Sequence, residues 1–227
     1  MTRARYALGI MSETAPAPLE LDLQAISGDL VRMLSLVRES CEWARRSLID
    51  ADQAAAAHCS ELDDEVDAIQ ARLEVRILTV IARRQPAARD LRFLGAALQA
   101  LADIERAGDY AQHVADVGRS LALEPPLKKY LDMQRIFEVL ATMIDATSKA
   151  FAEADAVAAR RAHGLDAEID DLYDQIQREL LTYMLADPKS IGRATQLLAV
   201  ARYLERLGDH LENVNEHIIF WLEAVRL

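Results

Sequence analysis

Hydrophobic residues recur every three to four positions from about residue 19 to the end of the chain. This spacing is typical of amphipathic α-helices, which turn one apolar stripe toward a core. Interruptions of the pattern divide the region into six predicted helices, at residues 20–50, 53–84, 87–121, 127–153, 156–186 and 189–226. The connections between them are short, so we expect neighbouring helices to run antiparallel. The predicted fold class is all-α.

Short polar or proline-containing stretches separate these helices. They lie at Asp50–Asp52, Gln85–Pro86, LEPPL (123–127), near Asp155 and at ADPKS (186–190). Proline has no amide hydrogen and cannot continue a helix interior, so the proline pair in LEPPL is the strongest interruption. We therefore place a domain boundary between residues 122 and 127.

The two parts of the chain on either side of this boundary repeat one pattern. LDDEVDAI (62–69) parallels LDAEIDDL (165–172), and IERAGDYAQHVAD (104–116) parallels LERLGDHLENVNE (204–216). A duplicated supersecondary unit gives such internal similarity. The repeat predicts two three-helix domains, at residues 19–122 and 127–227. Residues 1–18 are expected to be a flexible lead, with Met11 as an alternative start.

An acidic stripe recurs in both halves. In the second half it consists of Glu205, Asp209, Glu212 and Glu216, which lie on one helix face because each residue turns the helix by about 100°. The matching positions of the first half are Glu105, Asp109, Gln112 and Asp116. Like charges four residues apart repel by a few tenths of a kcal/mol per pair. A solvated face is one interpretation of the stripe, and its retention in both halves favours a functional one.

Further carboxylates and a glycine accompany each stripe. The preceding predicted helix carries Asp63 and Asp67 in the first half, and Asp166 and Asp170 in the second. Gly108 and Gly208 recur in mid-helix, where glycine costs about 1 kcal/mol relative to alanine. They are either a vestige of duplication or positions where a neighbouring helix or a partner approaches closely.

Composition and charge exclude several classes of protein. The formal net charge of −11 argues against a nucleic-acid binder, which needs a basic face. No stretch approaches the 18 apolar residues of a membrane-spanning helix. Cys41 and Cys59 form no CxxC motif, which favours a reduced, cytoplasmic location. The sequence contains neither a glycine-rich phosphate loop nor a nucleophile elbow, so we do not expect an enzyme.

Two segments resemble the signature regions of the PhoU family of phosphate-transport accessory and regulatory proteins. They are ARRQPAARDLRFLGAALQALADIERAGDYA (82–111) and LLTYMLADP (180–188) followed by ARYLERLGDHLENVNEHIIFWL (201–222). The resemblance extends from about residue 20 to residue 227 and includes both copies of ERxGD. It implies two tandem three-helix bundles related by a pseudo-twofold axis.

The resemblance also implies a function in phosphate signalling. Members of the family couple the phosphate ABC transporter, through its ATPase, to the phosphate-sensing histidine kinase. They act as negative regulators of the phosphate-starvation regulon and influence phosphate uptake. A cytoplasmic homodimer is expected, which associates with the membrane only peripherally, through its partners.

Some family members bind metal clusters through E(D)xxxD motifs, and these motifs can be carried over residue by residue. The candidate metal ligands in this chain are Asp63, Asp67, Glu105, Asp109, Asp166, Asp170, Glu205 and Asp209. Glu212 and Glu216 are expected to support the second set as outer ligands, whereas Gln112 leaves the first set with less charge. Carboxylate-rich sites suit Mg, Mn or Fe, and Zn is also compatible.

Two alternatives to this function remain open from the sequence. A ferritin-like di-metal oxidase also carries carboxylates on a helical bundle, but it requires Glu-x-x-His pairs, and no Glu here precedes a His by three residues. A plain helical scaffold without metal or a phosphate link is the second alternative.

Overall fold

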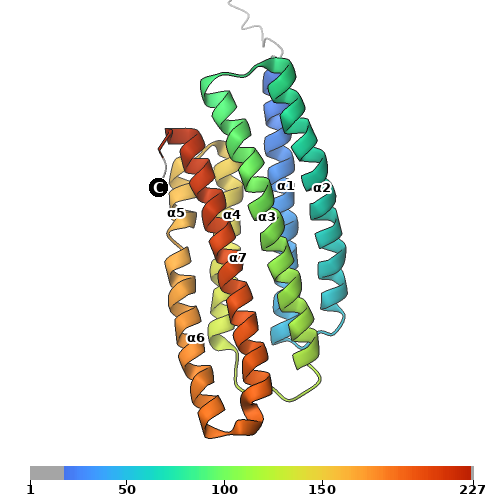
Figure 1. Ribbon diagram of the computed structural model, residues 1–227, viewed down its shortest axis with the longest axis vertical. Helices are drawn as coiled ribbons and strands as arrows, with labels where there is room; N and C mark the ends of the chain where they lie inside the picture. The colour runs from blue at the N-terminus through green and yellow to red at the C-terminus, as the bar shows by residue number, and fades with distance from the viewer. Residues whose placement is uncertain (1–17, 226–227) are drawn as a thin grey trace, which may run out of the picture.

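The computed structural model describes residues 18–225 and contains only helices in that part of the chain. The elements are α1 (Pro18–Ile49), α2 (Ala55–Arg84), α3 (Ala88–Leu121), α4 (Leu131–Glu153), α5 (Ala156–His163), α6 (Asp166–Ala186), the 3-10 helix η1 (Pro188–Ser190) and α7 (Ile191–Glu223). Long helices packed side by side give an elongated bundle (Figure 1). The all-α prediction is confirmed. The predicted lead lies almost wholly outside the described residues.

The helix expected over residues 156–186 is interrupted, which corrects the prediction of six continuous helices. α5 ends at His163, and α6 begins at Asp166 after the turn at Gly164. Glycine lowers helix propensity at the break, and the Leu165 amide donates to the Ala162 carbonyl, 3.1 Å away, as in a tight 3-10 turn. The break places Asp166 in the first turn of a helix, where the helix dipole stabilises a negative charge.

Other boundaries differ by a few residues from the prediction. The largest difference is the start of α4, at Leu131 rather than at residue 127. Just before this start, the Lys128 ammonium is buried and pairs with the carboxylates of Glu179 and Asp132.

The predicted boundary at residues 122–127 falls in the connection between α3 and α4. The division into two domains stays a prediction.

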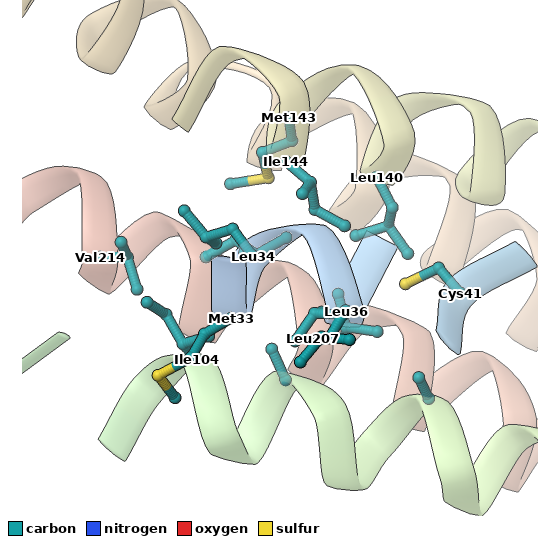
Figure 2. Packing of buried hydrophobic residues seen from close by; sticks show 14 of the residues in the cluster. Met33, Leu34, Leu36, Cys41, Ile104, Leu140, Met143, Ile144, Leu207 and Val214 are labelled. Atoms are coloured by element: carbon teal, nitrogen blue, oxygen red, sulfur yellow. The ribbon is translucent and has the colours of Figure 1, made fainter. Parts of the chain in front are cut away.

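The core lies along the central helices and continues through both halves of the chain. α3 packs against α7, and α1 packs against α4 (Figure 1). Figure 2 shows the meeting of side chains from both halves: Met33, Leu34 and Ile104 from the first, Leu140, Met143, Leu207 and Val214 from the second. The apolar stripe of α7 is fully buried at Leu204, Leu207, Leu211, Val214 and Ile218. Burial of each such side chain stabilises the fold by roughly 1.5–3 kcal/mol.

A polar cluster also joins α3 to α7. Asp103 of α3 faces His210, whose Nδ1 lies 2.9 Å from Oδ1, and His217, whose Nε2 lies 3.2 Å from Oδ2. Asn213 donates to Oδ1 at 3.4 Å. Burial alone would raise the pKa of Asp103, but the hydrogen bonds from the two histidines outweigh it and lower this pKa to about 2. The ionised carboxylate therefore stabilises the contact between the two halves.

None of the helices in the described region is long and apolar enough to cross a lipid bilayer.

Asp103→Asn should lower the free energy of unfolding at pH 7 by about 1–3 kcal/mol, because a partly buried charge-assisted contact is lost. The native carboxyl has a lowered pKa, so its stabilisation is present above the ordinary value of about 3.9 and disappears as the pH falls toward 2. Urea unfolding of both proteins at pH 7 and pH 3 measures the difference, which should shrink at pH 3.

The matched control is Asp145→Asn. Arg38 Nε lies 3.7 Å from Asp145 Oδ1, and this pair also joins the two halves, but the Asp145 side chain is 70% exposed. Such exposed pairs contribute little, so a change below about 0.5 kcal/mol is expected. Equal effects of the two substitutions would contradict a special role for Asp103.

Candidate metal centre

Three carboxylates from α6 and α7 converge in the second half. The ligand oxygens of Asp166, Asp170 and Asp209 all lie within 4.8 Å of one another. Asp166 and Asp170 are one helical turn apart on α6, so they point the same way, toward α7. Asp166 is 6% exposed, Asp170 is exposed and Asp209 is half-buried. The three therefore line a site that is closed at one end and open to solvent at the other.

Gly208 explains how Asp166 comes so close to α7. A Cβ atom at this position would lie 2.9 Å from Asp166 Oδ1 and 3.0 Å from Ile169 Cδ1. Real Cβ atoms essentially never approach another heavy atom to less than 3.0 Å. The glycine therefore leaves the space that the carboxylate fills. Close approach of the neighbouring helix explains this glycine better than a vestige of duplication does.

The Asp166 carboxylate has a buried oxygen with no protein partner. Oδ1 is inaccessible to solvent and accepts no hydrogen bond from the protein. Burial raises the pKa of Asp166 to about 7, together with repulsion from Glu212, Asp170, Asp209 and Glu205. A buried carboxylate is costly unless a proton or a cation neutralises it. The orphaned oxygen and the negative surroundings together fit a divalent cation with oxygen ligands.

Glu205 faces the same site but is already partly neutralised. Its Oε1 accepts a hydrogen bond from Arg202 at 3.2 Å, and Arg206 lies 3.7 Å from Oε2. Oε2 is nevertheless buried without a hydrogen bond. Burial and the nearby Asp209 raise the pKa of Glu205. Arg206 also pairs with Asp209, at 3.2 Å. These arginines compensate the acidic stripe on its solvent side.

The outer part of the acidic stripe meets a residue that the sequence analysis missed. His163, the last residue of α5, has Nε2 at 3.5 Å from Glu212 Oε1 and at 3.7 Å from Glu216 Oε1. The first half has Ser60 at the corresponding position, so the repeat gave no signal for a histidine there. The end of α5 at His163, just before the turn at Gly164, brings the imidazole to these two glutamates.

The first half contains a similar but looser arrangement. Asp63 and Asp67 belong to α2, and Glu105 and Asp109 belong to α3. Burial raises the pKa of Asp63 to about 6, with repulsion from Asp109, Asp67 and Glu105. Asp63 Oδ1 is also buried without a hydrogen-bond partner. Within residues 18–225, however, only the second-half carboxylates meet the ligand spacing of 4.8 Å.

The structure thus places the eight candidate ligands in two sets of four, one on α2 and α3 and one on α6 and α7. Within the described residues it brings only Asp166, Asp170 and Asp209 within ligand distance of one another. In both sets a buried carboxylate from the outer helix faces a glycine of the inner helix. That these residues bind metal stays a prediction. An all-oxygen ligand set is typical of Mg, Mn or Fe sites.

Comparison with known proteins identifies the family of this fold. Residues 30–117 and 133–218 each match the family model of the PhoU domain. The chain belongs to the PhoU family. The first match runs from α1 to α3 and the second from α4 to α7. Each PhoU match therefore contains one of the two carboxylate sets. Because the chain belongs to the PhoU family, the ferritin-like alternative is not supported.

Curated relatives carry one shared description, phosphate-specific transport system accessory protein PhoU homolog. The relative from Deinococcus radiodurans is 43% identical over 208 residues, which cover 92% of this chain and 98% of the relative. The relative from Pseudomonas aeruginosa is 34% identical and is covered to 83% of its length.

Solved PhoU structures share the fold. The crystal structure of PhoU from Pseudomonas aeruginosa superposes with a TM-score of 0.87 at 32% identity, covering 90% of this chain and 99% of that one. The regulatory protein PhoU from Streptococcus pneumoniae gives a TM-score of 0.84 at 22% identity, covering 92% of this chain and 99% of that chain. The prediction of a PhoU-type helical fold is confirmed.

Asp166→Asn should stabilise the metal-free protein at pH 8 by roughly 2–4 kcal/mol. The native carboxyl has a raised pKa of about 7, so its charge destabilises the fold progressively as the pH rises from about 4 through 7. The amide carries no charge and removes this cost. Urea unfolding in chelator should show the full difference at pH 8, a smaller one at pH 5 and little difference near pH 3.5, below the ordinary aspartate pKa. A variant less stable than the native protein at pH 8 would contradict the assignment.

Proposed function

We propose that this protein is a phosphate-transport accessory protein that restrains the phosphate-starvation regulon. It would couple the ATPase of the phosphate ABC transporter to the phosphate-sensing histidine kinase and modulate phosphate uptake. One observation carries the proposal: both halves match the PhoU domain, and relatives described as accessory proteins of phosphate-specific transport align along nearly the whole chain.

Neither of the two carboxylate sets favours direct recognition of phosphate. The candidate sites are acidic, and acidic sites repel an anion unless a cation is present. We therefore propose that phosphate status reaches this protein through its partners. It would act in the cytoplasm as a homodimer, without nucleic acid, and approach the membrane only through those partners.

We further propose that the carboxylate sets hold divalent cations. Asp166, Asp170 and Asp209 would provide the ligands of the second half, with Glu205 beside them. Asp63, Asp67, Glu105 and Asp109 would form the corresponding set of the first half. A bound cation would neutralise the carboxylates and join the outer helix of each half to the inner one. The sites would therefore have a structural and signalling role, with no catalytic residue assigned.

Metal removal tests the second proposal. Chelator should lower the melting temperature by roughly 5–10 °C relative to protein with Mn²⁺ at about 100 times its dissociation constant, because a ligand that binds only the folded state stabilises it by mass action. Asp209→Asn should abolish the second-half contribution to this shift. Asp145→Asn, which removes an exposed carboxylate outside the site, is the control that keeps the three ligands and their arginine partners. A melting temperature that does not change with Mg²⁺, Mn²⁺, Fe²⁺ or Zn²⁺ would refute metal binding. The acidic stripe would then be a solvated or partner-binding face.

A deletion strain tests the first proposal. Loss of the protein should raise alkaline phosphatase expression several-fold in phosphate-replete medium, since a negative regulator is missing. Affinity purification of the native protein should recover the transporter ATPase and the sensor kinase. Unchanged phosphatase expression together with recovery of neither partner would refute the regulatory function, whatever the metal measurements show.

A further inference from the structure

The two repeated glycines have unequal surroundings. A Cβ atom at Gly208 would lie 2.9 Å from Asp166 Oδ1 and 3.0 Å from Ile169 Cδ1. At Gly108 the corresponding distances are 3.5 Å to Asp63 Oδ1 and 3.7 Å to Val37 Cγ2, which are ordinary van der Waals contacts. A methyl group therefore fits at residue 108 and collides at residue 208.

The collision at Gly208 involves the buried part of the candidate metal centre. Asp166 Oδ1 is the oxygen that has no hydrogen-bond partner, and it belongs to the triad with Asp170 and Asp209. Ile169 lies beside this oxygen, since its Cδ1 and Cγ2 atoms would be 3.0 Å and 3.6 Å from the same added Cβ. A methyl group on α7 would therefore push the carboxylate away from Asp209, because the methyl carbon and Oδ1 would be only 2.9 Å apart.

We infer that Gly208 is a positioning residue for the second-half site, and that the two sites are unequal in their dependence on this glycine. Its missing side chain lets the Asp166 carboxylate lie against α7 with its oxygen facing Asp170 and Asp209. Gly108 has no such role toward Asp63. The inference rests on the proposed metal binding and adds the residue that shapes one of the two sites.

Matched alanine substitutions in the full-length protein test this inference. Mn²⁺ is titrated into chelator-treated native protein, Gly208→Ala and Gly108→Ala, and binding is followed by calorimetry. Gly208→Ala should lower the Mn²⁺ affinity of the second-half site by roughly ten-fold or more. Changes to groups that orient a metal ligand reduce metal affinity by this much. Gly108→Ala should bind like the native protein and melt at the same or a higher temperature without metal, since alanine favours the helix.

A double variant separates displacement of the carboxylate from loss of packing. Ile169→Val removes the δ-methyl carbon, which would lie 3.0 Å from the methyl group of an alanine at residue 208, and it leaves Asp166 in place. Combined with Gly208→Ala it should restore the metal-free melting temperature toward that of Ile169→Val alone. It should not restore Mn²⁺ binding, because the contact with Asp166 Oδ1 persists.

The outcomes distinguish the role of Gly208 from metal binding itself. Native-like Mn²⁺ binding by Gly208→Ala, or recovery of full binding in the double variant, would overturn the role of Gly208 while the metal proposal stands. Equal weakening by Gly108→Ala would overturn the inequality of the two sites. No Mn²⁺ binding by the native protein would refute the metal proposal and this inference together.

Discussion

Asp63 Oδ1 and Asp166 Oδ1 are two of the three carboxylate oxygens that are buried without a hydrogen-bond partner in the described structure. Each belongs to an outer helix and lies against an inner one that has a glycine at the point of contact. The cost of burying them is expressed in raised pKa values, about 6 for Asp63 and about 7 for Asp166. A proton or a cation that neutralises the carboxylate removes most of this cost. At Gly208 the close approach of α6 to α7 accommodates the Asp166 carboxylate.

The inner helices of the two halves also pack against each other. α3 and α7 carry the ERxGD motifs and pack side by side (Figure 1), and each also packs against the outer helix of its own half, α2 or α6. Asp103 lies two residues before the candidate ligand Glu105 and contacts His210, which follows the candidate ligand Asp209. The candidate ligands Glu105 and Asp209 are therefore near neighbours in sequence of the two residues that join the halves.

Hydrophobic periodicity and the internal repeat were sufficient to predict the helices, and the four-residue spacing of acids was sufficient to pair Asp166 with Asp170. The interruption at Gly164 was not predicted, because the apolar pattern continues across it and a turn of nearly helical geometry leaves little trace in sequence. The contacts of His163 with Glu212 and of Asp103 with His217 also escaped prediction. They join helices far apart in the chain, and their register depends on three-dimensional packing.

Anomalous diffraction from crystals grown with Mn²⁺ tests the central claim most directly. The account predicts a peak at the manganese edge between α6 and α7, within roughly 2.2 Å of the unpartnered Asp166 Oδ1, with Asp170 and Asp209 as further ligands. A well-ordered Asp166 carboxylate bound only to water or to protein groups, with no anomalous peak near it, would contradict the claim that this buried oxygen is held for a cation.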